Sequence, residues 1–241
     1  EGAIQDTPLL VENQQMYLYD DLSLFVDDNI QVTDLFKIKL GLRFTNFNGL
    51  CNVFEPRISS NYQFLPDQFL KFSYQKLYQF VHQAAVSSQS TPIDFYLPSN
   101  NSVKPQKSQQ ISLGYGRVFD FVSVEIDSYF KDVQNYIEFK NGSLHNLFTN
   151  DIYGDMSVGK LTSYGAEFSV KYQKEMLTAN LSYTYSKSEA QFDDINYGIK
   201  FPVVFDRPHN FNVLLSYPVN KKLTLGALFL LTSGQTYTPA K

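Results

Sequence analysis

The chain has 241 residues, 43% of them hydrophobic, with a formal net charge of −4 and a pI of about 5.4. This acidic balance lacks the basic surface that nucleic acid requires, so nucleic acid is excluded as the main partner. No stretch approaches the roughly 18 apolar residues of a membrane-spanning helix, and the single cysteine, Cys51, cannot form an intrachain disulfide. The length suits one large domain, and no internal boundary is visible.

Strict alternation of apolar and polar residues predicts β-strands along most of the chain. The first strand is expected from about Met16 to Val32, with a turn at Thr33-Asp34. The next strand, from Phe36 to Phe44, shows the pattern most clearly. One of its faces carries Phe36, Ile38, Leu40, Leu42 and Phe44, and the other carries Lys37, Lys39, Gly41, Arg43 and Thr45. Period-two alternation places the two sets on opposite faces of the strand.

The rest of the chain predicts eight more strands. They are expected at residues 57–64, 69–78, 108–116, 122–130, 162–171, 177–185, 209–217 and 223–232. Tight turns are expected at 65–68, 117–120, 173–175 and 218–221, and longer polar connections at 46–53, 82–107, 141–160 and 187–206. This gives about ten antiparallel strands in five hairpins. The last strand is unusual, because residues 226–231 are apolar on both faces.

Short and long connections in alternation are typical of a transmembrane β-barrel, with tight turns on one side of the membrane and large loops on the other. Most of the expected strands have roughly nine to eleven residues, the length that crosses a bilayer when tilted. A polar connection as long as 82–107 is uncommon in a compact soluble domain. A soluble β-sandwich with one solvated face is the alternative.

Charged residues share the polar face of these strands. They are Lys37, Lys39, Arg43, Lys71, Glu125, Asp127, Lys131, Glu167 and Lys171. Burying unpaired charges costs several kcal/mol each, so they predict a lumen that is either wide and hydrated or filled by a plug. Gly41, Gly114, Gly116 and Gly165 on or near this face would let another backbone approach closely.

Five motifs resemble the TonB-dependent outer-membrane receptors, most closely those of Bacteroidetes, in which a carboxypeptidase-regulatory-like domain often precedes the plug. The motifs lie in residues 54–78 (beginning FEPRIS), 97–106, 129–133, 163–167 and 205–209. Each is weak alone, but all five occur in the order of the family and cover about residues 17–238.

The resemblance implies a barrel of about 22 strands, closed by an N-terminal plug domain, in the outer membrane of a Gram-negative bacterium. It implies energised import of a metal chelate, vitamin, saccharide or peptide through a TonB box. Residues 1–241 are therefore expected to form part of the barrel, with the plug, the TonB box and the closing strands outside this chain. The expected partners are outer-membrane lipid, the plug and TonB, with a surface lipoprotein or a small-molecule ligand as further candidates.

Two other functions stay open at this stage: an omptin-like protease built on a self-contained ten-stranded barrel, and a scaffold or adhesion barrel that transports nothing. A protease would use an Asp and a His at the outer rim. Asp206 and His209 are three positions apart, which places them on opposite faces of a strand. None of His82, His145 and His209 lies in a catalytic motif, so no catalytic residue, metal ligand or cofactor is predicted.

Aromatic side chains in the polar loops are the candidate ligand contacts. Phe95, Tyr96, Tyr153 and Tyr197 have no core to join there, and such residues often contact a ligand, although packing of loop against loop is equally expected. The residues 206–209 are expected to organise a loop-to-strand junction. Glu55 and Arg57, two positions apart, are expected on one face, within reach of a salt bridge to a neighbouring strand or to the plug.

Overall fold

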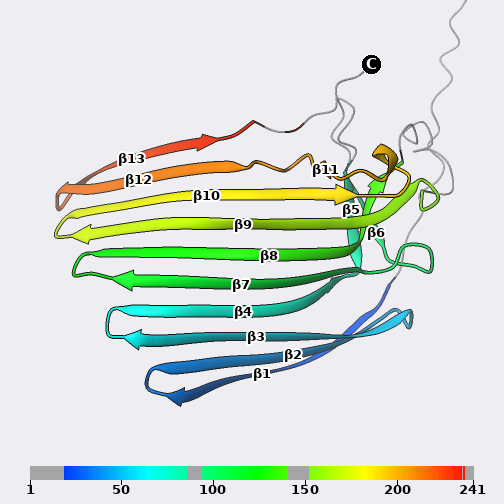
Figure 1. Cartoon of the computed structure of the whole chain (residues 1–241), viewed down its shortest axis with the longest axis horizontal. Coiled ribbons are helices and arrows are strands. Elements are labelled where there is room, and N and C mark those ends of the chain that lie inside the picture. Colours follow the sequence, from blue (N-terminus) through cyan, green and yellow to red (C-terminus); the bar gives the residue numbers. More distant parts are fainter. Residues whose placement is uncertain (1–18, 86–93, 141–151, 235, 237–241) are drawn as a thin grey trace, which may run out of the picture.

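Ten long strands form one curved antiparallel sheet in the computed structural model, which describes residues 19–85, 94–140, 152–234 and 236 (Figure 1). The strands are β1 (Asp21–Thr33), β2 (Phe36–Phe47), β3 (Cys51–Leu65), β4 (Gln68–Gln79), β7 (Gln106–Val118), β8 (Val122–Phe139), β9 (Met156–Lys174), β10 (Leu177–Gln191), β12 (His209–Asn220) and β13 (Leu223–Thr232). Each pairs with the next in this order. The predicted ten strands in five hairpins are confirmed, and residues 16–18 of the expected first strand lie outside the described residues.

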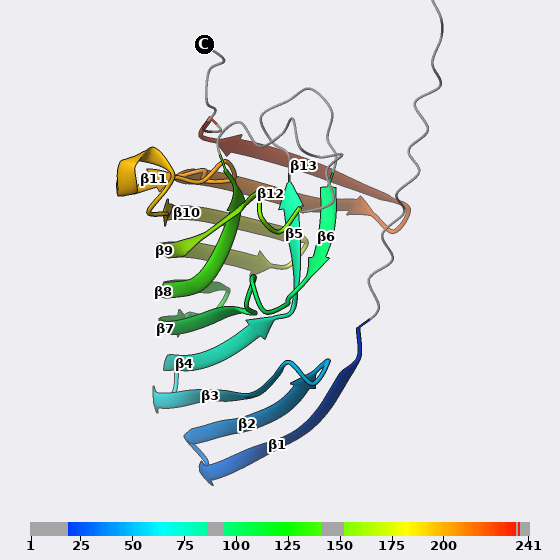
Figure 2. The same cartoon turned by 90° about the vertical axis from the view of Figure 1, so that its right-hand side faces the viewer.

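The register gives the sheet one polar and one apolar face. Lys39 lies opposite Ser59, which lies opposite Ser73, and the row continues through Ser112, Tyr129 and Gly165. The other face carries apolar side chains that are each more than a third exposed, including Leu42, Leu70, Leu113, Ile126, Phe168 and Phe229. A continuous exposed apolar face of this size needs a lipid or protein cover. Figure 2 shows that the sheet curves and that the β5–β6 hairpin lies on its concave side.

Several strands are longer than the alternation predicts. β8 and β9 have 18 and 19 residues, well beyond the roughly nine to eleven that cross a bilayer. The end of the sheet with the tight hairpin turns is called the turn end here, and the opposite end, with the longer connections, is called the loop end. The extra residues lie at the loop end, where polar and apolar residues no longer alternate regularly. A bulge at Asn135, whose φ is 57°, interrupts the register between Gln134 and Tyr136 and shifts the faces by one residue.

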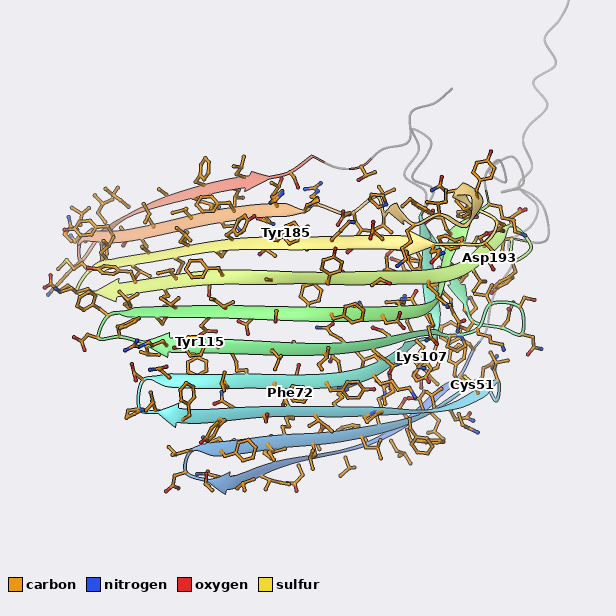
Figure 3. All side chains as sticks on the ribbon, in the orientation of Figure 1. Cys51, Phe72, Lys107, Tyr115, Tyr185 and Asp193 are labelled. Atoms are coloured by element: carbon orange, nitrogen blue, oxygen red, sulfur yellow. The ribbon has the colours of Figure 1, made fainter. Side chains whose placement is uncertain are left out.

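The predicted loop at 46–53 is wrong. β2 continues to Phe47 and β3 begins at Cys51, so the connection is a three-residue turn, Asn48 to Leu50. Asn48 and Gly49 adopt φ values of 50° and 64° there, a left-handed conformation that these two residue types tolerate best. Cys51, the first residue of β3, is half-buried at the loop end (Figure 3).

Two other long connections contain secondary structure that the sequence did not predict. The connection at 82–107 holds a hairpin of β5 (Val81–Ala85) and β6 (Asp94–Pro98), and β5 contacts β8. The connection after β10 holds a 3₁₀ turn, η2 (Asn196–Gly198), and a two-residue strand, β11 (Phe201–Pro202), that pairs with β10. Both connections are therefore folded parts of the loop end.

The buried core lies at the loop end in two small clusters. One contains Val133, Leu161, Ala190, Phe192, Ile195 and Val203, and the other contains Leu97, Val103, Ile137 and Met156. Val133, Leu161 and Ala190 belong to the polar face by register, so the β10–β12 connection folds over that face. None of the described residues forms a helix that is both long and apolar enough to cross a membrane.

Candidate functional site

The turn end of the concave face is an open polar trough that six strands, β1 to β4, β7 and β8, build together. A hollow of about 640 Å³ lies there, lined by residues such as Asn29, Lys37, Lys39, Asn61, Lys71 and Asp127. These side chains come to one place because the turns hold neighbouring strands in a register that aligns their polar positions. The register puts all the predicted lumen residues on this face: Lys37, Lys39, Arg43, Glu125, Asp127, Glu167 and Lys171.

A three-residue ion cluster crosses the trough from β4 to β8. The Nζ atom of Lys71 lies 2.6 Å from Oε2 of Glu125 and 3.3 Å from Oδ1 of Asp127. Gly114 on β7 lies between them in register, and a Cβ there would collide with Asp127 and crowd the Lys71 side chain. All three charged side chains are more than a third exposed, so water screens the cluster.

The predicted glycines make room for side chains of this chain itself. A Cβ at Gly116 would collide with the Phe69 ring, and one at Gly41 would collide with Asp27. Gly165 is closed off in the same way by the Tyr129 ring and the Tyr185 carbonyl. Side chains and backbone of neighbouring strands thus occupy the space beside these glycines, and a close approach of another backbone there stays a prediction.

Arg43 and Glu55 connect β1, β2, β3 and β4. Nη2 of Arg43 donates to Oγ of Ser23 at 2.8 Å, and its Nε lies 3.6 Å from Oε2 of Glu55. Glu55 is only 3% exposed, and its Oε1 accepts a 2.7 Å bond from the Tyr78 backbone N–H. Glu55 and Arg57 share one face, as predicted, and the predicted salt bridge of Glu55 to a neighbouring strand is the one with Arg43.

The remaining charges on this face have no ion-pair partner within the described part of the chain. Lys37 and Lys39 are exposed on β2, and Glu167 is exposed on β9. Glu167 also lies directly opposite Asp127 in register, a like-charge pair whose repulsion Lys71 offsets in part through its contact with Asp127. The trough thus has a cationic side at β2 and mixed charges at β8–β9, where Lys131 and Lys171 share the face with the three carboxylates.

The cluster of residues 206–209 organises the start of β12, as predicted. Asp206 is 5% exposed, and its Oδ1 accepts a 2.9 Å bond from the Ser188 backbone N–H. The Pro208 carbonyl accepts from the Ser186 N–H at 3.0 Å. His209 points away, with Nδ1 2.8 Å from the Tyr183 hydroxyl on the lipid-facing side.

The predicted ligand-contacting aromatics occupy different surroundings. Tyr96 and Tyr197 are 67% and 97% exposed, and Tyr197 lies in η2 with a φ of 56°. Tyr153 is half-buried, and its hydroxyl donates to the Pro98 carbonyl at 2.8 Å. The Phe95 side chain lies outside the described residues. A role of these four residues in ligand binding stays a prediction.

A second hollow, which sequence reasoning missed, lies at the loop end between β5, β8 and the β10–β12 connection. Its volume is about 370 Å³, and His82 and Glu138 line it. Burial raises the pKa of Glu138 to about 7 and that of Tyr136 to about 12, and burial lowers the pKa of His82. The sequence feature that could have revealed this hollow is a single acidic residue, Glu138, within the otherwise apolar run 136–139. Within the described residues, no three His, Cys, Asp or Glu side chains gather to hold a metal ion.

The chain matches the family model described as "TonB dependent receptor-like, beta-barrel" over residues 6–241. The chain belongs to this family. The concave polar face is therefore the inner face of an outer-membrane receptor barrel, and the convex apolar face is its lipid-facing side. The soluble sandwich alternative is wrong, because the ten long strands form a single layer.

Solved receptor structures share the fold. The siderophore receptor PirA from Acinetobacter baumannii matches with a TM-score of 0.63 at 17% identity, covering 88% of this chain and 33% of that one. PirA from Pseudomonas aeruginosa matches with a TM-score of 0.66 at 14% identity, covering 90% and 40%. The FrpB iron transporter from Neisseria meningitidis matches with a TM-score of 0.61 at 12% identity, covering 86% and 32%. The chain thus spans about a third of the length of these receptors. Among curated proteins, none matches this chain.

Proposed function

We propose that this chain forms part of the barrel wall and outer rim of a receptor that imports a scarce nutrient across the outer membrane of a Gram-negative bacterium. In this proposal TonB supplies the energy, and a plug domain, contributed by the part of the receptor outside this chain, fills the barrel. The family match and the shared fold of the siderophore and iron receptors support the proposal.

The unpaired charges of the trough carry the proposal. Lys37 and Lys39 on β2 and Glu167 on β9 make no ion pair within the described part of the chain, whereas Asp127 pairs with Lys71. A wall packed against a dry core would not keep such charges, because each unpaired one costs several kcal/mol. A plug with acidic residues facing β2 and a basic residue facing β9 would pair them.

Metal chelates are the first substrate class to test. The matched PirA proteins are siderophore receptors and FrpB is an iron transporter, while the identities of 12–17% support only the fold. Vitamins, saccharides and peptides are the substrate classes to test after metal chelates. A loss of growth on one nutrient after deletion of the whole receptor gene would identify the class.

The decisive experiment measures uptake by the whole receptor in cells with and without TonB. The double variant Lys37→Glu/Lys39→Glu reverses the cationic side of the trough and is expected to abolish uptake while the barrel still reaches the outer membrane. Lys221→Glu/Lys222→Glu, two lysines in the β12–β13 turn, is the matched control and is expected to retain uptake. Uptake that persists without TonB, or that the β2 variant leaves unchanged, would overturn the proposal. No uptake of any nutrient would favour the scaffold or adhesion barrel.

The geometry does not favour the protease alternative. Asp206 is buried and bonded to the β10 backbone, while His209 contacts Tyr183 on the opposite side of the wall. The two side chains therefore cannot act on one substrate. The family and its solved members are receptors and transporters.

A further inference from the structure

The hollow at the loop end combines polar groups that converge with apolar rings, the usual composition of a small-molecule site. His82 and Gln106 enter it from β5 and β7, and Tyr136, Glu138 and Phe139 enter it from β8. Phe205, from the β10–β12 connection, closes one side and is 60% exposed, so the hollow opens to solvent there. It lies beyond the membrane, because Glu138 is some sixteen residues along β8 from its turn.

Two polar groups in and beside the hollow lack a partner among the described residues. His82 is not one of them: it is 1% exposed, its Nε2 bonds to Oγ of Ser99 at 3.0 Å, and the Lys104 backbone lies beside its ring. The Ser157 hydroxyl, opposite Glu138 in register, is buried without a partner. Glu138 itself makes no hydrogen bond or ion pair within the described part of the chain. Native proteins leave few such groups unsatisfied without a functional reason.

The chemistry of the hollow is that of a cation site. Its one acidic side chain is desolvated, and no Lys or Arg of the described residues lines it. The other titratable groups that line it, His82 and Tyr136, are held uncharged near neutral pH by burial. Aromatic faces beside a carboxylate attract an organic ammonium group through ring electrostatics and direct charge.

We propose that the hollow formed by His82, Tyr136, Glu138, Phe139 and Phe205 is a binding site for a small organic ammonium compound at the outer rim of the receptor. The carboxylate of Glu138 and the aromatic rings hold the ammonium group, and Gln106 supplies a hydrogen bond to a polar group of the same ligand. The site does not depend on nutrient import, since it needs only the folded loop end.

The test uses choline as the probe and the whole receptor in detergent. Calorimetric titration is expected to show saturable binding of choline and none of its uncharged isostere, in which carbon replaces the nitrogen. Glu138→Gln is expected to weaken binding by about tenfold or more, since a desolvated charge contact is lost. Glu138→Asp is expected to retain part of it. Glu189→Gln is the matched control, because Glu189 lies at the same end of the barrel but pairs with Lys187 outside the hollow.

A second arm varies pH. Glu138 must be ionised to bind a cation, so choline affinity is expected to rise between about pH 6 and about pH 8 in the native receptor and to stay flat in Glu138→Gln. Equal binding of choline and its isostere, no saturable binding, or binding that Glu138→Gln leaves intact would each overturn the inference. These readouts involve no uptake, so failure here is distinct from failure of the import proposal.

Discussion

The two ends of the inner wall differ in how they satisfy their polar groups. At the turn end, Lys71 meets Glu125 and Asp127 in an open trough, and the neighbouring lysines stay exposed. At the loop end, Val133, Leu161 and Ala190 lie on the same face but are buried under a folded connection.

This difference separates two tasks of the same strands. Across the membrane, the wall keeps strict alternation, because lipid covers one side and a polar interior the other. Beyond the membrane, no lipid is present, and the inner face can be covered by the chain's own loops. Substitutions at the loop end should therefore cost packing energy, and substitutions at the turn end should mostly change weak electrostatic contacts.

The largest expected effect is that of Phe192→Ala. Phe192 is 1% exposed, and its ring packs against Tyr136 and Phe201, so its removal should cost about 3–5 kcal/mol of loop-end stability. Limited proteolysis of the whole receptor should show faster cleavage within residues 192–208. Phe205→Ala, in the same connection but exposed, should change the cleavage rate little. If Phe192→Ala and Phe205→Ala raise the cleavage rate equally, Phe192 does not belong to a water-free core.

The second effect concerns the pH dependence of the loop end. Burial raises the pKa of Glu138 from 4.5 to about 7, so the folded form binds this proton more tightly than the unfolded form. Stability is then greatest below about pH 4.5 and falls as the pH rises through 7, by up to about 3 kcal/mol. Urea unfolding of the receptor across this range should show the fall. If Glu138→Gln shows the same fall, another group is responsible.

The third effect tests the glycines of the turn end. Gly116→Ala should destabilise the barrel by about 1–3 kcal/mol, because the new Cβ would collide with the Phe69 ring. Gly226→Ala is the control, since the one atom near its Cβ is the Leu215 carbonyl oxygen at 3.7 Å. Thermal unfolding should separate the two variants. Adding Phe69→Ala should cancel the Gly116→Ala effect, and additive losses would argue against the collision.

The fourth effect tests the ion cluster. Lys71→Met should cost only about 1 kcal/mol, because all three side chains are more than a third exposed. A double-mutant cycle with Glu125→Gln, measured by urea unfolding, should give a coupling energy that shrinks as salt is added. A coupling of several kcal/mol that resists salt would mean that a plug covers the cluster.

The smallest effect on stability is that of Tyr197→Ala. Because the side chain is 97% exposed, stability should change by less than about 0.5 kcal/mol. Tyr153→Phe, which removes the hydrogen bond to Pro98, should cost somewhat more, about 0.5–1.5 kcal/mol. Thermal unfolding measures both. A loss of ligand binding in Tyr197→Ala without a loss of stability would assign the ring to the ligand.

Sequence reasoning succeeded where the membrane imposes the pattern. The expected strand at 223–232 coincides with β13, and the charges of the Phe36–Phe44 strand fall on the concave face. Tight turns leave few choices of register, so alternation and turn residues together determine which strands pair and which side chains share a face.

It failed where contacts distant in sequence decide the structure. The bulge at Asn135 moves every later residue of β8 to the other face, and the neighbouring sequence does not predict this bulge. The β5–β6 hairpin forms within a stretch rich in Ser, Gln and Pro, because β8 offers it a surface. Glu138 was missed for the same reason, since polarity in a sequence does not reveal whether a loop will cover the side chain.

The hairpin turns step along the sheet and do not form a level edge. In register Phe36, the first residue of β2, is level with Phe168 of β9, and β9 continues for six more residues to Lys174. Six residues span roughly 20 Å at about 3.3 Å per residue, and Figure 1 shows the β9–β10 turn lying further out than the β1–β2 turn. A stagger of this kind is what a sheet needs in order to close into a barrel of tilted strands.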